Sequence, residues 1–379
     1  MNIVTMQALN LDDIGGGAYQ KYMELISGCL DHGWHVYHIS PRGFNAISHE
    51  NLTHIGISKA TFRPIFLSYS LQVLIQLLFL GRASKIDTVL VFSPLEGLIG
   101  LAYRHFNKNA RVIVGFHGDQ IAGIQINDTL NFKTRAYIRI LDSIERLVVN
   151  RSDLLVFVSR HNRDNVLCRT KSHSAGRSLV IYNNINTRRI AALGEAKKIS
   201  TGDGNCVIGF VGNLFEKGKG LGCLIESFSI VKKKIPGAKL VIVGNGPDGP
   251  RLVASVKALG LQDDVIFTGY QANPLRYMKG FDLMVLPSMH EGFPLVILEA
   301  LAVGTPVIAS NVGGIPELLE HDKLLFRPGD PGELASKIID IFQNPGVYDD
   351  VRRLCDSRRQ IFEFSWTDEM IRAVEKIRV

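Results

Sequence analysis

The stretch FDLMVLPSMHEGFPLVILEALAVGTPVIAS, from Phe281 to Ser310, indicates the fold class of the chain. FDLMVLPS and TPVIAS are apolar runs that predict buried strands, MHEGF is a loop, and PLVILEALAVG has the length and composition of a helix. Strands joined by a covering helix are expected to be parallel. Glu291 precedes the helix and Glu299 lies inside it, so an otherwise apolar segment keeps two acidic residues eight positions apart.

Short apolar strands alternate with longer helical patterns along the rest of the chain. Continuous strands rich in Val, Ile and Phe, separated by helices, indicate parallel sheets covered on both faces. The expected strands are MNIVTM, HVYHIS, TVLVFS, ARVIVGF, LLVFVS and SLVIYN in the first half, and CVIGFVG, KLVIVG, DVIFTG, DLMVLPS and TPVIAS in the second. Each half is therefore predicted to be a doubly wound α/β unit.

The length of 379 residues is large for one core and comfortable for two. NTRRIAALGEAKKISTGDGN, from Asn186 to Asn205, has no strand pattern and ends in turn residues, as linkers do. We predict a first domain over 1–186, a linker over 187–204 and a second domain over 205–361. The last helical stretch, about 362–379, can pack back on the first domain.

Composition indicates a cytoplasmic enzyme or binding protein rather than an exported or membrane-spanning one. The amino-terminal residues lack the basic and then apolar layout of a secretory signal. The most apolar stretch, Phe66 to Leu80, has 15 residues, whereas a membrane span needs about 20, so a buried or interfacial helix is expected. The five cysteines are scattered, without the spacing of zinc or redox sites, which indicates reduced thiols.

The net charge of +7 is unevenly distributed. Residues 1–200 contain 23 Lys and Arg against 14 Asp and Glu, and the remainder contains 20 against 22. A basic first half can face nucleic acid, an anionic membrane surface or a phosphorylated substrate, or it can be an ordinary solvated face. Much of the surplus falls between Lys133 and Arg177.

The basic region includes NFKTRAYIRILDSIERLVVN, which is expected to form a helix. One stripe of this helix consists of Tyr137, Ile140, Leu141, Ile144 and Leu147. The stripe either packs against the sheet, as in most α/β units, or lies on a membrane surface with its cations toward anionic lipid.

The start of the helix after MHEGF is suited to bind an anion. Pro294 is expected at the first helical position, and the amides of Leu295 and Val296 lack intrahelical partners at the positive end of the dipole. Glu299 lies on the same face as Leu295, about 6 Å further along. A nucleotide sugar with its phosphate at the helix start would reach Glu299 with a diol and Glu291 with its hexose. The alternative is that both are surface glutamates.

EGFPLVILEALAVGTPVIASNVGGIPELL resembles the donor-site region of the GT-B glycosyltransferases of family four, the glycosyl transferases group 1. In that family an E-x7-E pair marks the nucleotide-sugar site. The resemblance extends through GGAYQKYMELISGCLDHGWHV, VIYNNIN, FVGNLFEKGKG, LVIVGNGP and VIFTGYQ, which together cover most of the chain. It implies two Rossmann-like domains facing across a cleft.

The resemblance also implies roles for individual residues. Glu299 would hold the ribose hydroxyls and Glu291 the donor sugar. The main chain between them would serve sugar and phosphate, through the N–H groups of all but Pro294; the residues are Gly292, Phe293, Pro294, Leu295 and Val296.

The pyrophosphate needs a countercharge, for which the family uses a basic pair. Lys219 stands at the lysine position, and Lys217 can assist it. Asn213 stands where arginine is usual in the family. An amide can donate a hydrogen bond but supplies no charge, so the lysines must do more.

Other loops at the carboxyl ends of strands are also implicated. Tyr270, or its neighbour Gln271, is the candidate contact to the base, although a core or surface aromatic is an equal alternative. Gly16 and Gly17 follow the first strand, where glycine lets the main chain approach a ligand closely.

His117 follows a buried strand at the place of the cleft histidine of the family, near the donor hexose. A lone histidine is more often structural. Asp119 is a weaker candidate.

The implied reaction is a same-face, retaining transfer of a hexose to an acceptor hydroxyl. The departing phosphate, stabilised by Lys219 and helix amides, takes the acceptor proton. The candidate catalytic residues are His117, Lys219 and Glu291. No Asp-x-Asp ends a strand, so no metal or other cofactor is expected.

The expected donor is a UDP-hexose, UDP-glucose first and GDP-mannose next. The expected acceptor is a glycan or a lipid-linked precursor in polysaccharide biosynthesis, met in the cytoplasm or at the inner membrane surface; nucleic acid is not expected as a partner. The alternatives are a nucleotide-sugar 2-epimerase or hydrolase of the same architecture, and a module that binds nucleotide sugar without turnover.

Overall fold

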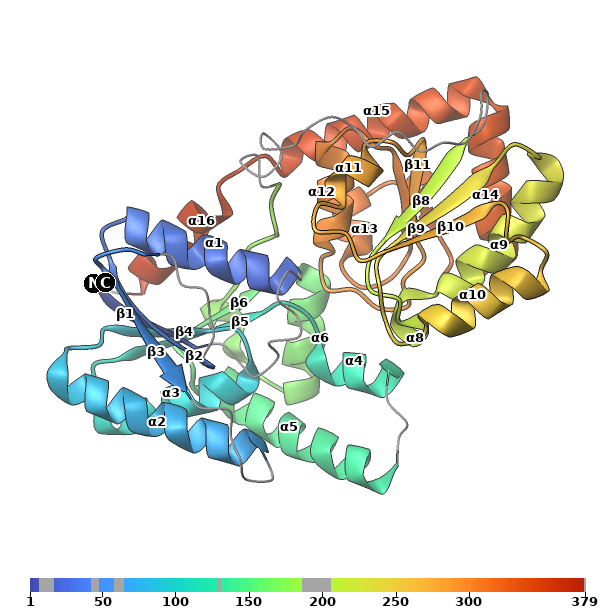
Figure 1. The fold of residues 1–379 in the computed structure, drawn as a ribbon. Coiled ribbons are helices and arrows are strands. Elements are labelled where there is room, and N and C mark those ends of the chain that lie inside the picture. Colours follow the sequence, from blue (N-terminus) through green and yellow to red (C-terminus); the bar gives the residue numbers. More distant parts are fainter. Residues whose placement is uncertain (7–16, 42–47, 58–64, 128–130, 186–205, 378–379) are drawn as a thin grey trace. The chain divides into compact units, whose positions relative to one another are not determined.

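The computed structural model describes residues 1–6, 17–41, 48–57, 65–127, 131–185 and 206–377. The chain divides into two compact units, drawn in Figure 1. The first comprises Met1–Ile121, Asp128–Tyr182 and Ser365–Val379, and the second Ala122–Asn127 and Asn183–Phe364. The predicted linker lies outside the described residues.

The first unit is built on a seven-stranded sheet in the order β3-β2-β1-β4-β5-β6-β7, and the recorded strand pairs are parallel. The order reverses at β1, which lies between β2 and β4. The strands are β1 Asn2–Met6, β2 His35–Pro41, β3 Leu52–Ile57, β4 Thr88–Val91, β5 Arg111–Phe116, β6 Leu154–Phe157 and β7 Ser178–Val180.

Helices cover both faces of this sheet. In Figure 1, α1 lies on one face, and α2, α3 and α5 lie on the other. The helical segments are α1 Gly17–Asp31, α2 Ile65–Ala83, α3 Pro94–Phe106, α5 Phe132–Arg151, α6 Arg160–Thr170, η2 Ser174–Arg177 and α16 Trp366–Lys376. Helix α4, Gln120–Asn127, starts in this unit, and its residues from Ala122 onward belong to the second unit.

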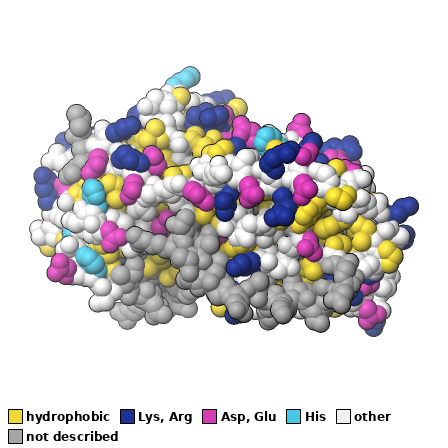
Figure 2. Space-filling view, turned by 90° about the horizontal axis from the view of Figure 1, so that it is seen from above, with side chains coloured by type: hydrophobic (Ala, Val, Ile, Leu, Met, Phe, Trp, Pro, Cys, Tyr) yellow, Lys and Arg dark blue, Asp and Glu magenta, His cyan; other side chains and the backbone are white. Residues whose placement is uncertain are grey.

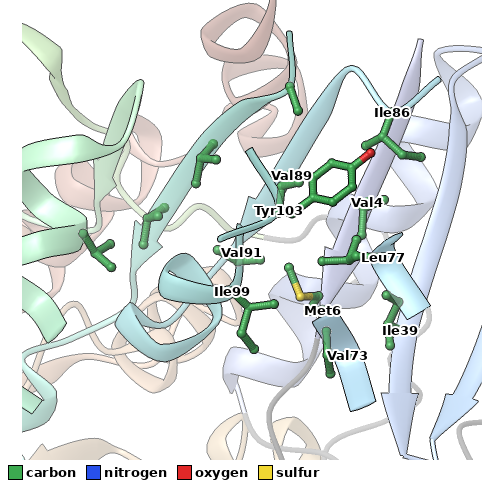
Figure 3. Packing of buried hydrophobic residues seen from close by; sticks show 14 of the residues in the cluster. Val4, Met6, Ile39, Val73, Leu77, Ile86, Val89, Val91, Ile99 and Tyr103 are labelled. Carbon is green, nitrogen blue, oxygen red and sulfur yellow. The ribbon is translucent and has the colours of Figure 1, made fainter. Parts of the chain in front are cut away.

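The core beneath α2, α3 and α5 explains why the first-half strands are so apolar. Strand residues such as Val4 and Val89 pack against Leu77 of α2 and Tyr103 of α3, as Figure 3 shows. These side chains are almost completely buried, and burying each one contributes roughly 1.5 to 3 kcal/mol. The sheet is therefore held by side chains that alternate toward this face.

The last helix, α16, packs against α1 within the first unit. A Cβ atom on Gly28 of α1 would lie 1.8 Å from Cγ2 of Thr367, so only glycine fits at this crossing. Trp366 is buried beside Lys21, whose ammonium lies 5.0 Å from the ring centroid. Close packing of α1 and α16 therefore joins the end of the chain to its beginning.

The second unit is built on a six-stranded sheet in the order β10-β9-β8-β11-β12-β13, again with parallel pairs. Its order reverses at β8, which lies between β9 and β11. The strands are β8 Val207–Val211, β9 Lys239–Val243, β10 Val265–Gly269, β11 Leu283–Leu286, β12 Val307–Ser310 and β13 Leu325–Phe326.

In the second unit, α9 packs with α10 and α14, whereas α12 packs with α11 and α15. The helical segments are α8 Glu216–Lys219, α9 Leu221–Lys234, α10 Gly249–Ala258, α11 Leu275–Met278, α12 Leu295–Ala302, α13 Ile315–Leu319, η3 Asp322–Leu324, α14 Pro331–Gln343 and α15 Pro345–Ile361. The prediction of two doubly wound parallel α/β units is confirmed.

The structure adds two strands that the sequence pattern did not indicate, β3 and β13. Strand β3, LTHIGI, lies at the edge of its sheet and is largely half-buried, so it lacks the continuous apolar run used to recognise the others. Strand β13 has only two residues. Both are edge strands, where one neighbour is missing. The smaller demand for apolar side chains explains β3, whereas β13 is buried and apolar but too short to form a pattern.

The surface facing the viewer in Figure 2 has basic and acidic side chains interspersed. The basic surplus of the chain is therefore not gathered on that face. Among the described helices, none is long and apolar enough to cross a membrane.

Candidate functional site

The functional candidates of the second unit lie in loops at the carboxyl edge of its sheet. Lys219 follows β8, and Glu291 follows β11. These two strands are neighbours at the point where the strand order reverses, which is where open α/β sheets bind ligands.

The structure pairs these two side chains directly. Nζ of Lys219 lies 2.6 Å from Oε1 of Glu291, and both side chains are largely shielded from solvent. Ser288 donates a second hydrogen bond to the same oxygen, at 2.8 Å. Among the described residues, no donor is recorded at Oε2 of Glu291, which leaves that oxygen able to accept from a ligand.

Glycines allow the loops to approach closely enough for this pairing. Gly220 has φ +61°, and a Cβ atom there would lie 2.3 Å from the carbonyl oxygen of Pro287. The amide of Met289 donates to the carbonyl of Gly218 at 2.9 Å. The loops after β8 and β11 are thus fastened main chain to main chain.

A third loop, after β12, packs against the main chain of Glu291. Gly313 has φ +58°, and a Cβ atom there would lie 1.8 Å from the carbonyl oxygen of Glu291. The hydroxyl of Ser310 donates to the carbonyl of Ser288. Ser310 and Ser288 are both fully buried, so the residue that donates to the carboxylate of Glu291 is itself held in place.

Helix α12 begins one residue later than expected. Pro294 is the residue before the helix rather than its first residue, because its ψ of 118° is extended, and Leu295 is the first helical residue. Leu295, Val296 and Glu299 are half-buried while Ile297 is fully buried. The predicted common face of Leu295 and Glu299 is therefore present, and the first amides of the helix have no intrahelical acceptors.

The loop that enters α12 is held rigidly within the second unit. Asn183 donates from Nδ2 to the carbonyl of Phe293 at 2.8 Å, and the buried Phe293 ring meets Phe362 edge on. Gly292 lies in this loop and is half-buried. The amides proposed to face an anion are consequently preordered.

The remaining candidates of the second unit lie at the same edge but are more exposed. Asn213 follows β8 and is exposed, and Lys217 lies in α8. Tyr270 follows β10 and is 68 % exposed. Gln271 donates to the carbonyl of Thr268 at 2.9 Å. The structure thus distinguishes Lys219, which is paired with Glu291, from Lys217.

In the first unit, His117 follows β5 and packs against an aromatic ring. Its ring stacks on Phe92, the residue after β4, with centroids 4.6 Å apart. Burial, with a smaller contribution from the charge of Lys21, lowers the pKa of His117 to about 4. Its Nε2 atom is buried and has no hydrogen-bond partner among the described residues. His117 is therefore neutral near pH 7.

Gly17 is the first residue of α1, so this helix starts two residues earlier than the expected start near Tyr19. Gly16, the other glycine expected near the ligand, lies outside the described residues.

Asp119 has a structural partner. Its Oδ2 accepts from Arg169 of α6 at 2.6 Å, and the same guanidinium binds Glu145 of α5 at 2.7 Å. The two carboxylates are almost fully buried. This triad anchors the loop that follows His117 to two helices.

A row of polar side chains crosses the first sheet beside α1, buried at Thr5 and His38 and half-buried at His54. Thr5, His38 and His54 are in register on β1, β2 and β3, and Nδ1 of His38 lies 3.1 Å from Oγ1 of Thr5. Tyr22 of α1 also reaches Nδ1, at 3.3 Å. Burial, together with the charge of His54, lowers the pKa of His38 to about 3.

Sequence reasoning missed the supporting residues Ser288, Ser310, Phe92 and Arg169. Only Ser288 carries a local signal, since it lies three residues before Glu291 in the same loop. The partners of the others are 22 or more positions away along the chain. Within the described residues, no three His, Cys, Asp or Glu side chains are arranged to hold a metal ion.

Two family models match consecutive parts of the chain. "Glycosyltransferase Family 4" matches residues 15–189, and "Glycosyl transferases group 1" matches residues 195–358. A curated relative, the N-acetyl-alpha-D-glucosaminyl L-malate synthase of Bacillus anthracis, is 25 % identical over 284 residues, which cover 73 % of this chain and 70 % of the relative.

Solved structures with the same fold cover the whole chain. Sucrose-phosphate synthase from Thermosynechococcus elongatus has a TM-score of 0.80 at 21 % identity, over 100 % of this chain and 99 % of the other. HepE from Anabaena, in complex with UDP-glucose, has a TM-score of 0.72 at 18 % identity, with the same coverage. Together with the two matched models, the fold shows that this chain is a GT-B glycosyltransferase and belongs to the glycosyl transferases group 1.

Proposed function

We propose that the chain is a retaining transferase that moves a hexose from a nucleoside-diphosphate sugar to an acceptor hydroxyl. The observation that carries the proposal is the Lys219–Glu291 pair beside the start of α12, with Glu299 one turn further along. A nucleotide sugar matches this order of groups, since it has a hexose, a diphosphate and a ribose diol in sequence.

Lys219 is suited to contact the phosphate and Glu291 together. An ammonium has three N–H donors, and the recorded pair uses one of them. The others can stabilise the charge that develops on the departing phosphate, alongside the amides of Leu295 and Val296. No metal ion is needed for this role.

Glu291 is suited to position the hexose. Its Oε1 is occupied by Lys219 and Ser288, whereas Oε2 is available to accept from sugar hydroxyls. Glu299 would accept from the ribose hydroxyls.

The transfer breaks the bond between the anomeric carbon and the phosphate oxygen and forms one from that carbon to the acceptor oxygen on the same face. The acceptor proton passes to the departing phosphate. Neutral His117 would supply a hydrogen bond near the hexose without competing for that proton. Neither glutamate is required as a covalent nucleophile.

UDP-glucose is the donor to test first, followed by GDP-mannose, and the acceptor is a glycan or a lipid-linked precursor. HepE, of the same fold, is described in complex with UDP-glucose, and the name of the Bacillus relative specifies an alpha linkage. Both agree with the proposal.

The deciding experiment incubates the protein with each nucleotide sugar, with and without lipid-linked or soluble glycan acceptors. Nucleotide release that depends on an acceptor, with an α-linked product by NMR from an α-linked donor, supports the proposal. Release without acceptor indicates a hydrolase, a changed sugar configuration indicates an epimerase, and binding without turnover indicates a binding module. A β-linked product contradicts retention.

A chelator separates the metal-free account from its alternative. Activity should persist in EDTA. Loss in EDTA with recovery in manganese would contradict the role given to Lys219.

A further inference from the structure

Seven of the eight exposed large apolar side chains in the described part of the first unit lie on α2 and α5. On α2 they are Leu71, Ile75 and Phe79, which are 60 %, 41 % and 61 % exposed. On α5 they are Phe132, Tyr137, Ile140 and Leu147. A concentration of this kind on one layer of a domain indicates an interaction surface.

The α2 residues form a stripe, because they are spaced by four. The opposite side of the same helix already supplies Val73 and Leu77 to the core, where both are completely buried. A helix that packs one stripe needs no second apolar stripe for folding. The outer stripe is therefore available for a partner.

The predicted stripe of α5 divides between two surroundings. Leu141 is buried and Ile144 is partly buried against the core, whereas Tyr137, Ile140 and Leu147 are exposed. Packing against the core is thus confirmed for Leu141 and Ile144, whereas the membrane alternative stays a prediction for the exposed residues.

Both helices cover the same face of the first sheet. Leu77 of α2 and Val148 of α5 belong to one buried cluster, with α3 packed against each helix. Figure 1 shows α2 and α5 on the same side of that sheet. We call their outer surface the docking face. It consists of the apolar residues Leu71, Ile75, Phe79, Phe132, Tyr137, Ile140 and Leu147 and exposed cations of the same two helices, Arg82, Lys133, Arg135 and Arg139.

Positive charge accompanies the apolar residues. From Ile65 to Ile86 the chain contains no acidic residue, and Arg82 is exposed near the end of α2. On α5, Lys133, Arg135 and Arg139 are exposed.

The acidic residues of α5 do not cancel this charge. Asp142 is paired with Arg146 at 3.5 Å, and Glu145 is buried against Arg169. The docking face thus combines apolar side chains with unbalanced positive charge.

We propose that the docking face lies on an anionic lipid bilayer and holds the first unit as a peripheral membrane protein. Apolar side chains flanked by cations match the boundary between acyl chains and anionic headgroups. A second copy is a poorer occupant, because a two-fold contact would place two faces with the same surplus of positive charge against each other. The proposal does not depend on which sugar is transferred.

Vesicle flotation tests it. The protein should bind phosphatidylglycerol vesicles, should bind phosphatidylcholine vesicles weakly, and should dissociate as salt rises from about 50 to about 300 mM. Leu71→Gln combined with Phe79→Gln should lower partitioning at least about tenfold, since two exposed apolar side chains leave the interface. Arg135→Glu with Arg139→Glu should lower it further and flatten the salt dependence.

Matched controls lie in the second unit. Val253 and Ile361 are exposed apolar residues, and Arg251 and Lys257 are exposed cations. Changing the two apolar residues to Gln, or the two cations to Glu, alters the composition and charge as much as the docking-face variants do. These variants should partition as the parent protein does, and all variants should keep its melting temperature.

Equal binding to neutral and anionic vesicles, absence of binding at low salt, or equal losses in the controls would overturn the proposal. So would a dimer in solution that the Leu71 and Phe79 changes dissociate, which would assign the face to a second copy. UDP binding by calorimetry should be unchanged in the docking-face variants, which separates failure here from failure of the proposed function.

Discussion

Lys219 and Glu291 are 72 positions apart in the sequence, and their side chains meet at 2.6 Å where the second sheet reverses its strand order. Oε1 of Glu291 also accepts a hydrogen bond from Ser288, so two donors fix the orientation of the carboxylate. A charged pair shielded in this way has one partner left uncompensated when the other is removed. The pair therefore provides the sharpest tests of the site.

Lys219→Ala should lower kcat by about a hundredfold, because phosphate charge in the transition state loses its nearest cation. Lys217→Ala, two residues away in α8, is the matched control and should cost less than about fivefold. Steady-state kinetics with the identified donor checks both. Equal losses would mean that the assignment to Lys219 is wrong.

Glu299→Gln should weaken UDP binding by roughly 1 to 3 kcal/mol, since an amide nitrogen replaces one acceptor oxygen at the ribose diol. Glu226→Gln changes an exposed glutamate on α9 and should leave affinity unaltered. Calorimetry with UDP measures the difference. Unchanged affinity in the α12 variant would remove Glu299 from the site.

Ser288→Ala should lower kcat/KM with the nucleotide sugar about tenfold, because Glu291 loses a hydrogen bond that orients it toward the hexose. UDP affinity should stay the same, since UDP carries no hexose. Ser227→Ala is the control and should leave kcat/KM unchanged. Ser227 is as buried as Ser288, but its hydroxyl has no hydrogen-bond partner among the described residues. A parallel loss of UDP binding would indicate a general structural effect.

Gly28→Ala should destabilise the protein by about 1 to 3 kcal/mol, because its new Cβ would overlap Thr367 where α16 crosses α1. Gly123→Ala in α4 meets nothing within 4 Å and should be neutral or stabilising, as expected from helix propensity. Urea unfolding compares them. Equal stability of the two variants would contradict the close packing of α16.

Acid should destabilise the first unit. The pKa of His38 is lowered by burial to about 3 in the fold, so its neutral form stabilises the protein above the unfolded pKa of about 6.5. As pH falls below 6.5 the unfolded chain binds the proton first, and by about pH 5 the loss from His38 is about 2 kcal/mol. His117, lowered to about 4, acts in the same direction.

Unfolding free energies measured from about pH 7.5 to about pH 4.5 test this linkage. A His38→Gln variant should have a shallower pH dependence, whereas His105→Gln, at an exposed position, should follow the parent curve. Identical curves for all three proteins would exclude His38 as a source of acid lability.

The sequence determined the architecture because parallel strands buried on both faces must be continuously apolar. Runs such as KLVIVG and DLMVLPS therefore predicted β9 and β11, and the helix pattern after MHEGF placed Glu299 on the face of Leu295. The shared motifs also identified the family. Edge strand β3 was not predicted, because its side chains are largely half-buried and need not be continuously apolar.

Which side chains contact and support one another depends on the tertiary structure. Strand order brings the loops after β8 and β11 together, and this fixes Lys219 on Glu291 and leaves Lys217 outside the pair. The fold also pairs Asp119 with Arg169 and leaves the outer stripe of α2 exposed. Local pattern records whether a residue is buried or exposed, but contacts between distant residues depend on how the strands are ordered and how closely glycines let the loops approach.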